Sequence, residues 1–379
     1  MKKWDVIVLG LGGAGSSVLY HLARQGLTAL GLDQYPEAHP FGSSHGQTRI
    51  VRQAYFEAPF YVPLLKRSYE LWDNLNAIAS RELFIKCGVL QIGAPDGVVV
   101  PGVLSSSKLH DLPIEVLSQK EIHHRWSGIH CPEDSIGAFE SNAGLVHVEE
   151  VVRTHLSLAK QHGAVVRHLT KVRGWEESSK GVCFDLGSEK VFASQVVLSA
   201  GPWSKFVLGD RVTSSIKILK KHLYWFESRD RAMRLDHQMP CFFHETSDGY
   251  FYGFPEIDEQ GVKLAMHSGG QEISEPSQRD HETVDKGEEF EPCLSYASRF
   301  VPGVTSRLKR HQVCYYSMTG DENFLLGRPN VDSRVVVVAG LSGHGFKFTP
   351  VIGEIAAKLV IGQSVPFDLG PFAVNRFDL

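Results

Sequence analysis

Apolar and polar residues recur with regular spacing in the first part of the chain. Asp5 to Leu9 form a β-branched apolar run of strand length, and apolar residues at helical spacing follow from Val18 to Ala23. The helical pattern stops at Gly26, and a second short apolar run extends from Thr28 to Leu32. This order predicts a strand–helix–strand unit in which Gly26 ends the helix.

The turn between the first strand and the helix is rich in glycine and reads Gly10-Leu11-Gly12-Gly13-Ala14-Gly15. Gly10 permits a tight turn, Gly12 lets backbone amides approach a pyrophosphate, and Gly15 lets the helix pack close to the strand. Asp33 follows the second strand, where its carboxylate suits a ribose hydroxyl and would repel a 2′-phosphate. These features together predict a dinucleotide site and leave NAD and FAD both open.

Periodic segments also divide the rest of the chain. Helical spacing predicts helices over 61–80, 148–162 and 351–361, and apolar runs predict strands over 83–92, 165–169, 182–186, 195–198 and 335–338. Period-two alternation predicts strands over 218–226, 250–254 and 262–266. Residues 271–290 are acidic and polar and are expected to form a solvated surface segment, whereas 93–145 show no clear pattern.

Parts of a nucleotide-binding fold are expected at the start of the chain, near 150–205 and after 330, with strand-rich segments between them. We predict an α/β fold (α+β overall), in which a discontinuous Rossmann-like FAD-binding or NAD-binding domain adjoins an antiparallel β-sheet substrate domain. The expected cofactor domain comprises residues 1–85, 146–215 and 320–379, and the expected substrate domain comprises residues 86–145 and 216–319.

Composition argues against several classes of protein. The 379 residues carry a net charge of −4, and no basic patch interleaved with aromatic residues suggests a nucleic-acid partner. No apolar stretch has the length of a membrane span, and Asp5 interrupts the apolar run that a signal peptide would need. The six cysteines are scattered without metal-ligand spacing, so we expect no metal site and a reduced, cytoplasmic setting.

The segment from Gly42 to Arg52 combines small and hydroxyl residues with two arginines. Ser43 and Ser44 allow a cofactor to approach closely, and Arg49 and Arg52 offer planar cations for a carboxylate. Two arginines three positions apart also fit a solvated helix face, and their spacing alone does not decide between these interpretations.

Three other places allow a functional and a structural interpretation. The segment from Gly343 to Lys347 follows a buried strand, as sites at the carboxyl edge of a sheet do, although a surface glycine loop also fits. In a predicted strand, alternation places Lys263, Ala265 and His267 on one face, and a solvent-facing lysine is the usual explanation. Cys314 by itself fits a buried structural cysteine.

Taken together, four motifs resemble the monomeric sarcosine oxidase and N-methyltryptophan oxidase family, within the wider glycine oxidase and D-amino acid oxidase group of flavoproteins. They are Gly-Ser-x-His-Gly-x-Thr-Arg over 42–49, Tyr-Gly-Phe-Pro over 252–255, Val-Cys-x-Tyr over 313–316 and Ser-Gly-His-Gly-Phe-Lys-Phe over 342–348. The resemblance covers nearly the whole chain and implies FAD rather than NAD. It implies a monomeric enzyme that oxidises an N-methyl amino acid such as sarcosine to an imine and reduces O2 to H2O2.

The resemblance also implies roles for individual residues. Cys314 would join FAD covalently through its sulfur, with His45 as the next candidate, and Lys263 would stabilise charge that develops on oxygen. Arg52 and Lys347 would bind the substrate carboxylate. The other residues implied in substrate binding are Tyr252, Phe243 and Gly343, and the others implied in catalysis are Thr48, Arg49, His267, Tyr316 and His344. Cofactor contacts are implied for Gly10, Gly12, Gly13, Ala14, Gly15, Asp33, Gln34, Ser43, Ser44, Arg49, Val172, Ala200, Gly201, Trp203, Cys314, Gly343, Gly345, Phe346 and Lys347.

Two departures from the family pattern bear on the substrate. Ser44 and Gln47 stand in a loop that commonly reads Ser-His-His-Gly-Asp, and Phe243 stands where sarcosine oxidases have methionine. The nearest alternative is an oxidase of a cyclic or glycated amino acid (pipecolate, proline or a fructosyl amino acid), which the pocket around Phe243 and Tyr252 would decide. From another class, the alternative is a flavin dehydrogenase with a non-oxygen acceptor, against which Lys263 argues.

Overall fold

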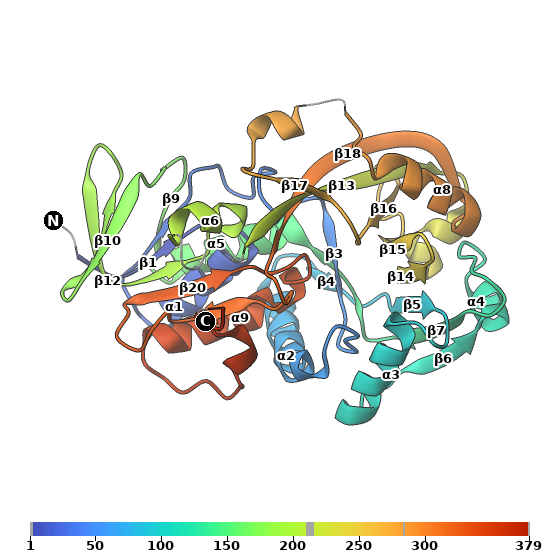
Figure 1. Cartoon of the computed structure of the whole chain (residues 1–379), viewed down its shortest axis with the longest axis horizontal. Coiled ribbons are helices and arrows are strands. Elements are labelled where there is room, and N and C mark those ends of the chain that lie inside the picture. The colour runs from blue at the N-terminus through green and yellow to red at the C-terminus, as the bar shows by residue number, and fades with distance from the viewer. Residues whose placement is uncertain (1–2, 210–215, 283–284, 378–379) are drawn as a thin grey trace.

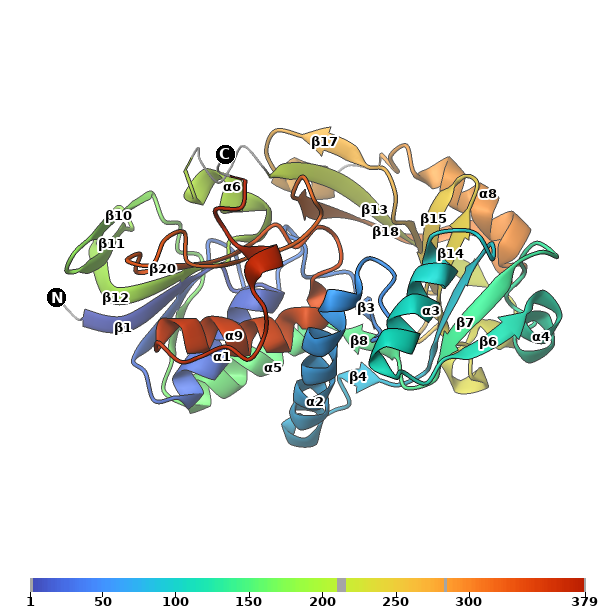
Figure 2. The same cartoon turned by 60° about the horizontal axis from the view of Figure 1, so that its bottom comes forward.

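The computed structural model describes residues 3–209, 216–282 and 285–377. The molecule is elongated, with one large sheet towards each end (Figure 1), and a turn of the view shows helices gathered beneath the N-terminal sheet (Figure 2). Within the described ranges, every helix is too short or too polar to cross a membrane.

One sheet has eight strands and a parallel centre. Its strands are β1 (Lys3–Leu9), β2 (Ala29–Leu32), β9 (Val165–Arg167), β10 (Gly174–Ser178), β11 (Gly181–Asp185), β12 (Lys190–Leu198), β19 (Leu325–Gly327) and β20 (Val335–Ala339). β1 pairs in parallel with β2 and β12, and β9 and β20 extend the parallel order on the two sides. The strand runs predicted around 5–9, 28–32 and 335–338 are confirmed as its buried centre.

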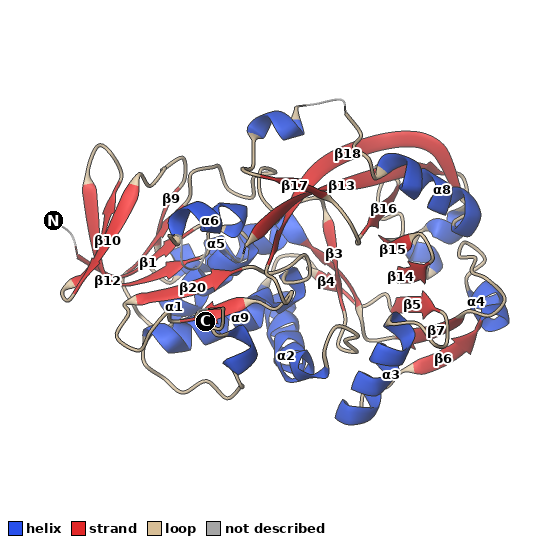
Figure 3. Cartoon of the chain, viewed as in Figure 1, coloured by secondary structure: helices blue, strands red, loops and turns tan. Residues whose placement is uncertain are grey.

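Three helices pack together next to this sheet. They are α1 (Gly13–Arg24), α5 (Val148–Gln161) and α9 (Thr349–Val360). α1 lies against both other helices and shares a buried core with them and with β1. Helices appear blue below the left-hand sheet in Figure 3. The predicted strand–helix–strand unit and its α/β fold are confirmed.

A second sheet has nine strands and is almost wholly antiparallel. Its strands are β5 (Val89–Gly93), β6 (Glu115–Ser118), β7 (Ile136–Glu140), β13 (Lys217–Ser228), β14 (Cys241–Thr246), β15 (Gly249–Gly253), β16 (Val262–Met266), β17 (Gln271–Ile273) and β18 (Val304–Met318). The long strands β13 and β18 pair along most of their length, and β14 joins β5 in the sheet's parallel pair. Three helices, α3 (Val99–His110), α4 (Gln119–Arg125) and α8 (Phe290–Phe300), pack against this sheet.

A small third sheet lies between the two large ones (Figure 1). It consists of β3 (Thr48–Val51), β8 (Gly144–His147) and β4 (Phe84–Ile85). β3 follows the loop after β2 and carries Arg49, the first arginine of the 42–52 segment. The small sheet therefore places Arg49 between the two larger sheets. The other α-helices within the described ranges are α2 (Val62–Ile78) and α6 (Ser204–Val207).

The structure departs from the sequence predictions in three places. The strand expected over 83–92 is two strands, because the chain bends at Gly88, whose φ is +83°. The unassigned stretch 93–145 contains two helices, two whole strands and the start of β8. The prediction that residues 271–290 form a solvated surface segment is wrong in part, because Glu289 is buried and pairs with Lys221. The predicted domain boundary at residue 215 lies outside the described residues.

Lys221 and Glu289 form an ion pair inside the protein. The Lys221 side chain is 1% exposed, and its ammonium contacts the Glu289 carboxylate and donates 2.8 Å to the Ser268 carbonyl. Glu289 also accepts the backbone N–H of His222 at 3.1 Å. A buried charge that loses its partner is strongly unfavourable, so this pair fixes the segment before α8 against β13.

We expect the substitution Glu289→Ala to lower the free energy of unfolding by about 3–5 kcal/mol, because it leaves Lys221 buried without its counter-ion. Urea denaturation followed by circular dichroism measures the loss. Glu288→Ala, at the exposed neighbouring position, is the matched control and should change stability little. A loss below about 1 kcal/mol for Glu289→Ala would contradict the assigned role.

Candidate active site

A cavity of about 500 Å³ extends from the glycine turn after β1 to the strands of the nine-stranded sheet, and residues of all three sheets line it. Most of the predicted site residues are brought together there. Those lining it are Gly10, Gly12, Gly13, Ala14, Asp33, Gln34, Ser43, Ser44, Arg49, Arg52, Val172, Ala200, Gly201, Trp203, Phe243, Tyr252, His267, Cys314, Tyr316, Gly343, His344, Gly345, Phe346 and Lys347. Gly15, Thr48 and Lys263 lie just outside this lining.

The end of the cavity beside β1 is built for a dinucleotide. A Cβ at position 15 would lie 1.8 Å from the Gly10 carbonyl oxygen, so only glycine lets α1 start this close to β1. Gly12 has no side chain to cap α1, and the Ser44 hydroxyl accepts the N–H of Gly13 at 2.9 Å, so the positive end of the helix meets the cavity beside a residue of the 42–52 segment. Asp33 accepts the backbone N–H of Leu11 at 2.7 Å, which fixes its carboxylate at the carboxyl edge of the sheet. These features fit the pyrophosphate and ribose of the FAD that the sequence implies.

The opposite end of the cavity gathers two cations around one carboxylate. Arg52 follows β3 and donates to both oxygens of Glu57, at 2.7 and 2.9 Å. Burial alone would raise the pKa of Glu57, but the charge of Arg52, together with that of Lys347, lowers it to about 2, so Glu57 is ionised. Arg49 lies on the short strand β3, Arg52 follows that strand, and both line the cavity. The two arginines are therefore not on a solvated helix face, which was the alternative that their spacing allowed.

Lys347 is the second cation at this end and is 7% exposed, so it does not belong to the surface glycine loop that was the alternative for residues 343–347. Its ammonium donates 2.9 Å to the His344 carbonyl and lies 3.5 Å from the Tyr55 hydroxyl. Burial, followed by repulsion from Arg52 and Arg49, lowers the pKa of Lys347 to about 7. A ligand carboxylate would stabilise its charged form, as would any anion placed between Lys347 and Arg52.

His344 is held from both ring nitrogens. Its Nε2 lies 3.0 Å from the Glu322 carbonyl and its Nδ1 lies 2.5 Å from the Tyr55 hydroxyl. The carbonyl can only accept, so Nε2 carries the proton and Nδ1 accepts from Tyr55. The Tyr55 oxygen is then left with lone pairs for Lys347. Burial is the main cause that lowers the pKa of His344 to about 4, which keeps the ring neutral at pH 7.

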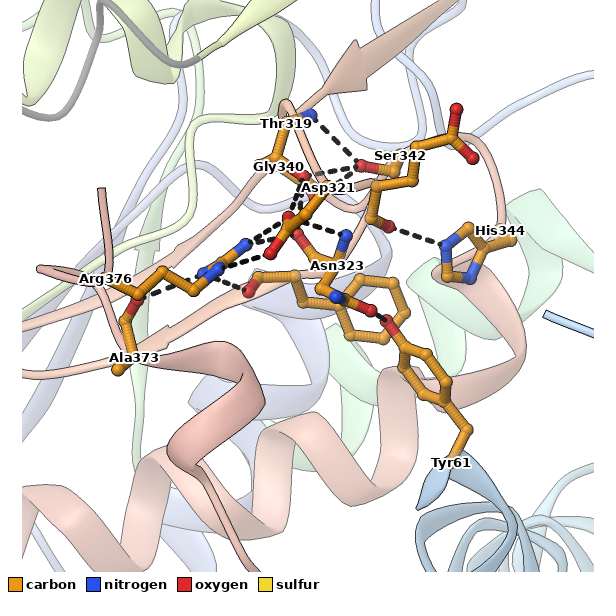
Figure 4. Close-up of polar contacts among 11 residues, drawn as sticks. Tyr61, Thr319, Asp321, Asn323, Gly340, Ser342, His344, Ala373 and Arg376 are labelled. Carbon is orange, nitrogen blue, oxygen red and sulfur yellow. Dashed lines mark hydrogen bonds and ion pairs between the residues drawn. The ribbon is translucent and has the colours of Figure 1, made fainter. Parts of the chain in front are cut away.

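The segment that presents the Glu322 carbonyl is clamped by an arginine near the C-terminus (Figure 4). Arg376 donates to the two oxygens of Asp321, both at 2.8 Å, and to the backbone carbonyl of Asn323 at 2.9 Å. Tyr61 donates 3.0 Å to the Asn323 side chain from the other side. This network fixes the loop 319–324 and with it the tautomer of His344.

Lys263 lies beneath the cavity, and it is buried at 1% exposure rather than facing solvent. Its ammonium donates 2.7 Å to each of the carbonyls of Gly46 and Thr48. Glu149 accepts the backbone N–H groups of Gly46 and Gln47 at 2.8 and 3.2 Å, which holds that turn in place. Burial and the nearby charge of Arg49 keep the pKa of Lys263 well below the usual range for lysine.

Cys314 lies on β18 and lines the cavity at 1% exposure. The guanidinium of Arg49 donates to its sulfur at 3.3 Å and to the Ser43 carbonyl at 2.9 Å. The buried position agrees with both interpretations of this cysteine, and its place in the cavity lining brings its sulfur to the wall of the cavity.

Aromatic side chains from the nine-stranded sheet form another wall of the cavity. Phe243 on β14 and Tyr252 on β15 are paired across the strands, and both line the cavity. The Tyr316 hydroxyl lies 3.4 Å from Nδ1 of His267, whose pKa burial lowers to about 3. A Cβ at position 343 would lie 2.5 Å from the Tyr316 ring, which makes glycine necessary there. The wall is apolar and presents neutral hydrogen-bonding groups.

Sequence reasoning missed Glu57 and Tyr55. Glu57 lines the cavity and pairs with Arg52, while Tyr55 lies under the Arg52 guanidinium, 4.4 Å from Cζ to the ring centroid. Both residues lie between the 42–52 segment and the helix predicted over 61–80, and this position was the only feature of the sequence that pointed to them. Neither belongs to a repeating or glycine-rich pattern.

Comparison with known proteins gives full-length matches. A family model described as FAD dependent oxidoreductase matches residues 5–359. A monomeric sarcosine oxidase of Streptomyces avermitilis is 37% identical, with 98% of this chain and 97% of the relative aligned. An N-methyl-L-tryptophan oxidase of Salmonella enteritidis is 33% identical, with 99% of both chains aligned.

Two solved structures show the same fold. NikD, described as an unusual amino acid oxidase essential for nikkomycin biosynthesis, superposes with a TM-score of 0.86 at 21% identity, covering 98% of each chain. Glycine oxidase from Geobacillus kaustophilus superposes with a TM-score of 0.80 at 18% identity, covering 99% of each chain.

The pKa of Lys347 predicts how carboxylate binding depends on pH. The affinity for acetate, measured by calorimetry, should be greatest below pH 7, where Lys347 is charged, and should fall as the pH rises through about 7 and beyond. The limiting slope is about tenfold per pH unit. Glu57 stays ionised over this range, so it does not supply the transition.

Lys347→Met is the control for this titration and should bind acetate weakly, with little change in affinity across the same transition. An affinity in the unsubstituted protein that is constant between about pH 6 and about pH 9 would contradict the assignment.

Proposed function

The chain belongs to the monomeric sarcosine oxidase and N-methyltryptophan oxidase family of FAD-dependent oxidoreductases, and we propose that it is an oxidase of N-methyl amino acids. The reaction converts the secondary amine to an imine and reduces O2 to H2O2. The observation that carries this proposal is the pair of buried cations, Arg52 and Lys347, which line the same cavity as the aromatic wall and Cys314.

The substrate carboxylate would bind between Arg52 and Lys347. Arg52 is already engaged by Glu57, so the substrate must share the guanidinium or displace that carboxylate. The aromatic wall formed by Phe243 and Tyr252 would then contact the amine side. His267 is neutral at pH 7 and, with the apolar wall, favours the uncharged amine, which is the form that can be oxidised.

The residues around the glycine turn after β1 would hold FAD. Gly12 and the start of α1 would face its pyrophosphate, and Asp33 its ribose. When bound, FAD accepts two electrons from the substrate and passes them to oxygen. The chain's own contribution is to fix the substrate by its carboxylate, since a correctly oriented reacting carbon removes much of the entropic barrier.

Lys263 is proposed to promote the oxygen half of the reaction. Its ammonium is held by two carbonyls beneath the cavity, so its position is set before oxygen arrives. A fixed cation in a buried site stabilises negative charge that develops on oxygen far better than one in water. Its lowered pKa, caused by burial and by Arg49, is raised again when negative charge enters the cavity.

We further propose that Cys314 bonds covalently to FAD. The support is its place in the cavity wall and the Arg49 donor beside its sulfur. We also propose that residues 1–85, 146–215 and 320–379 form the cofactor domain, and that 86–145 and 216–319 form the substrate domain. A monomer that works in the cytoplasm stays a prediction from the sequence.

The substrate class is tested by supplying the purified holoenzyme with a panel of N-methyl and cyclic amino acids and measuring oxygen uptake and H2O2. We expect turnover with at least one N-methyl amino acid and one H2O2 for each O2 consumed. Turnover with cyclic or glycated amino acids alone would contradict the proposed substrate class, and reduction without peroxide would contradict an oxidase.

Lys263→Met should slow the reaction of the reduced enzyme with O2 by about 10²–10³-fold, because the fixed cation is lost. Stopped-flow measurement separates this step from flavin reduction by substrate, which should change by less than about tenfold. Lys217→Met, at an exposed lysine on β13, is the control and should change neither rate. Equal losses in the two steps would contradict the role of Lys263.

Cys314→Ser should release its flavin into the supernatant on acid precipitation, whereas the unsubstituted enzyme should keep it in the pellet. Cys293→Ser removes another buried thiol, outside the cavity lining, and should behave like the unsubstituted enzyme. Flavin that stays with the protein in Cys314→Ser would overturn this attachment and direct attention to His45.

A further inference from the structure

Two cysteines outside the cavity lining face each other in the half of the protein built on the nine-stranded sheet. The sulfurs of Cys87 and Cys241 lie 3.8 Å apart, in residues separated by 154 positions in sequence. We propose that Cys87 and Cys241 are a redox-active thiol pair that hydrogen peroxide oxidises to an intramolecular disulfide. Peroxide produced by the enzyme itself would be one source, and that part of the proposal rests on the proposed function.

The backbone holds the two thiols in position. Cys87 lies in the bend between β4 and β5, and Cys241 begins β14, which pairs in parallel with β5. Gly88 donates 2.8 Å to the Ala143 carbonyl, and its own carbonyl accepts the backbone N–H of Cys241 at 3.1 Å. The bend and the strand start are therefore bonded directly to each other. A disulfide needs the sulfurs to approach by about 1.8 Å, a movement that the two side chains can share.

Cys87 and Cys241 differ in exposure and in the direction of their pKa shifts, and these differences indicate which thiol reacts with peroxide first. Cys87 is partly exposed, whereas Cys241 is buried. The hydrogen bond from the Cys241 thiol, with further bonds from backbone groups, lowers the pKa of Cys87, while burial raises the pKa of Cys241. The thiolate is the reactive form, so Cys87 is the residue that peroxide reaches first.

One molecule of hydrogen peroxide is enough to oxidise the two thiols to the disulfide. The Cys87 thiolate attacks one peroxide oxygen, the O–O bond breaks, and the leaving hydroxide takes a proton to become water. The resulting sulfenic acid is then attacked by the Cys241 sulfur, which forms the S–S bond and releases a second water with the Cys241 proton. Both sulfurs are oxidised by one electron each, and the peroxide is reduced to two waters.

The disulfide would link parts of the protein that carry the active site. Cys241 starts the strand that presents Phe243 to the cavity, and Cys87 follows the small sheet whose first strand carries Arg49. The two cysteines also pack in the same hydrophobic cluster as Phe243 and Cys314. The oxidised bond would therefore tie the sheet carrying Arg49 to the strand carrying the substrate wall.

The test treats the reduced holoenzyme with graded H2O2, quenches it by alkylation and maps cysteines by peptide mass spectrometry. We expect a peptide pair joined through Cys87 and Cys241, with the mass lowered by two hydrogen atoms and restored by dithiothreitol. Cys87→Ser and Cys241→Ser should each abolish it, and Cys183→Ser should leave it unchanged. The oxidised enzyme should also unfold at a higher temperature, because the bond closes a long loop of chain.

The proposal is overturned if both thiols remain alkylatable after peroxide treatment, if Cys87 is oxidised only to sulfinic acid, or if the bond joins other cysteines. Added peroxide tests the thiol pair whether or not the enzyme makes peroxide, so failure here differs from failure of the proposed function. In a second arm, substrate and oxygen replace added H2O2, and catalase should then suppress the disulfide. A disulfide unaffected by catalase would overturn the proposed peroxide source.

Discussion

The structure depends on positive charge that is buried in one cavity. Arg49, Arg52 and Lys347 line it and Lys263 lies beneath it, while Glu57 is the carboxylate that pairs with Arg52. Burying a charge without compensation is unfavourable, and here it lowers the pKa of both lysines. Backbone carbonyls and aromatic rings offset part of this cost. The remaining imbalance is relieved by an anion, which is why the cavity suits a carboxylate ligand and a reaction that develops negative charge.

All three sheets contribute to the positions of these charged side chains. The eight-stranded sheet supplies the glycine turn and the loop before Lys347, and the nine-stranded sheet supplies Lys263, Phe243 and Cys314. The small sheet brings Arg49 between them. Residues far from the cavity also contribute, because Arg376 fixes the loop whose carbonyl sets the tautomer of His344. The site is therefore a product of the tertiary arrangement as much as of any single motif.

The sequence predicted the parts that depend on local spacing. The strand–helix–strand unit with its glycines needs only neighbouring residues, and it was recognised with its strands and helix in the right order. The direction of Lys263 was not decided, because alternation places it on a face without saying which face is buried. Glu57 was missed because it meets Arg52 through an irregular turn after β3, and such a turn leaves no periodic pattern in the sequence. Glu289 was taken for a solvated residue because its buried partner, Lys221, comes from a distant strand.

The most direct test compares an N-methyl amino acid with its own carboxamide under anaerobic conditions, following the bleaching of the flavin absorbance in the holoenzyme. The two compounds share the amine and the methyl group and differ only in the charge that Arg52 and Lys347 would recognise. We expect rapid bleaching by the carboxylate form and bleaching by the carboxamide that is slower by at least about 10²-fold. Equal rates for the two compounds would contradict the claim that these buried cations position the substrate.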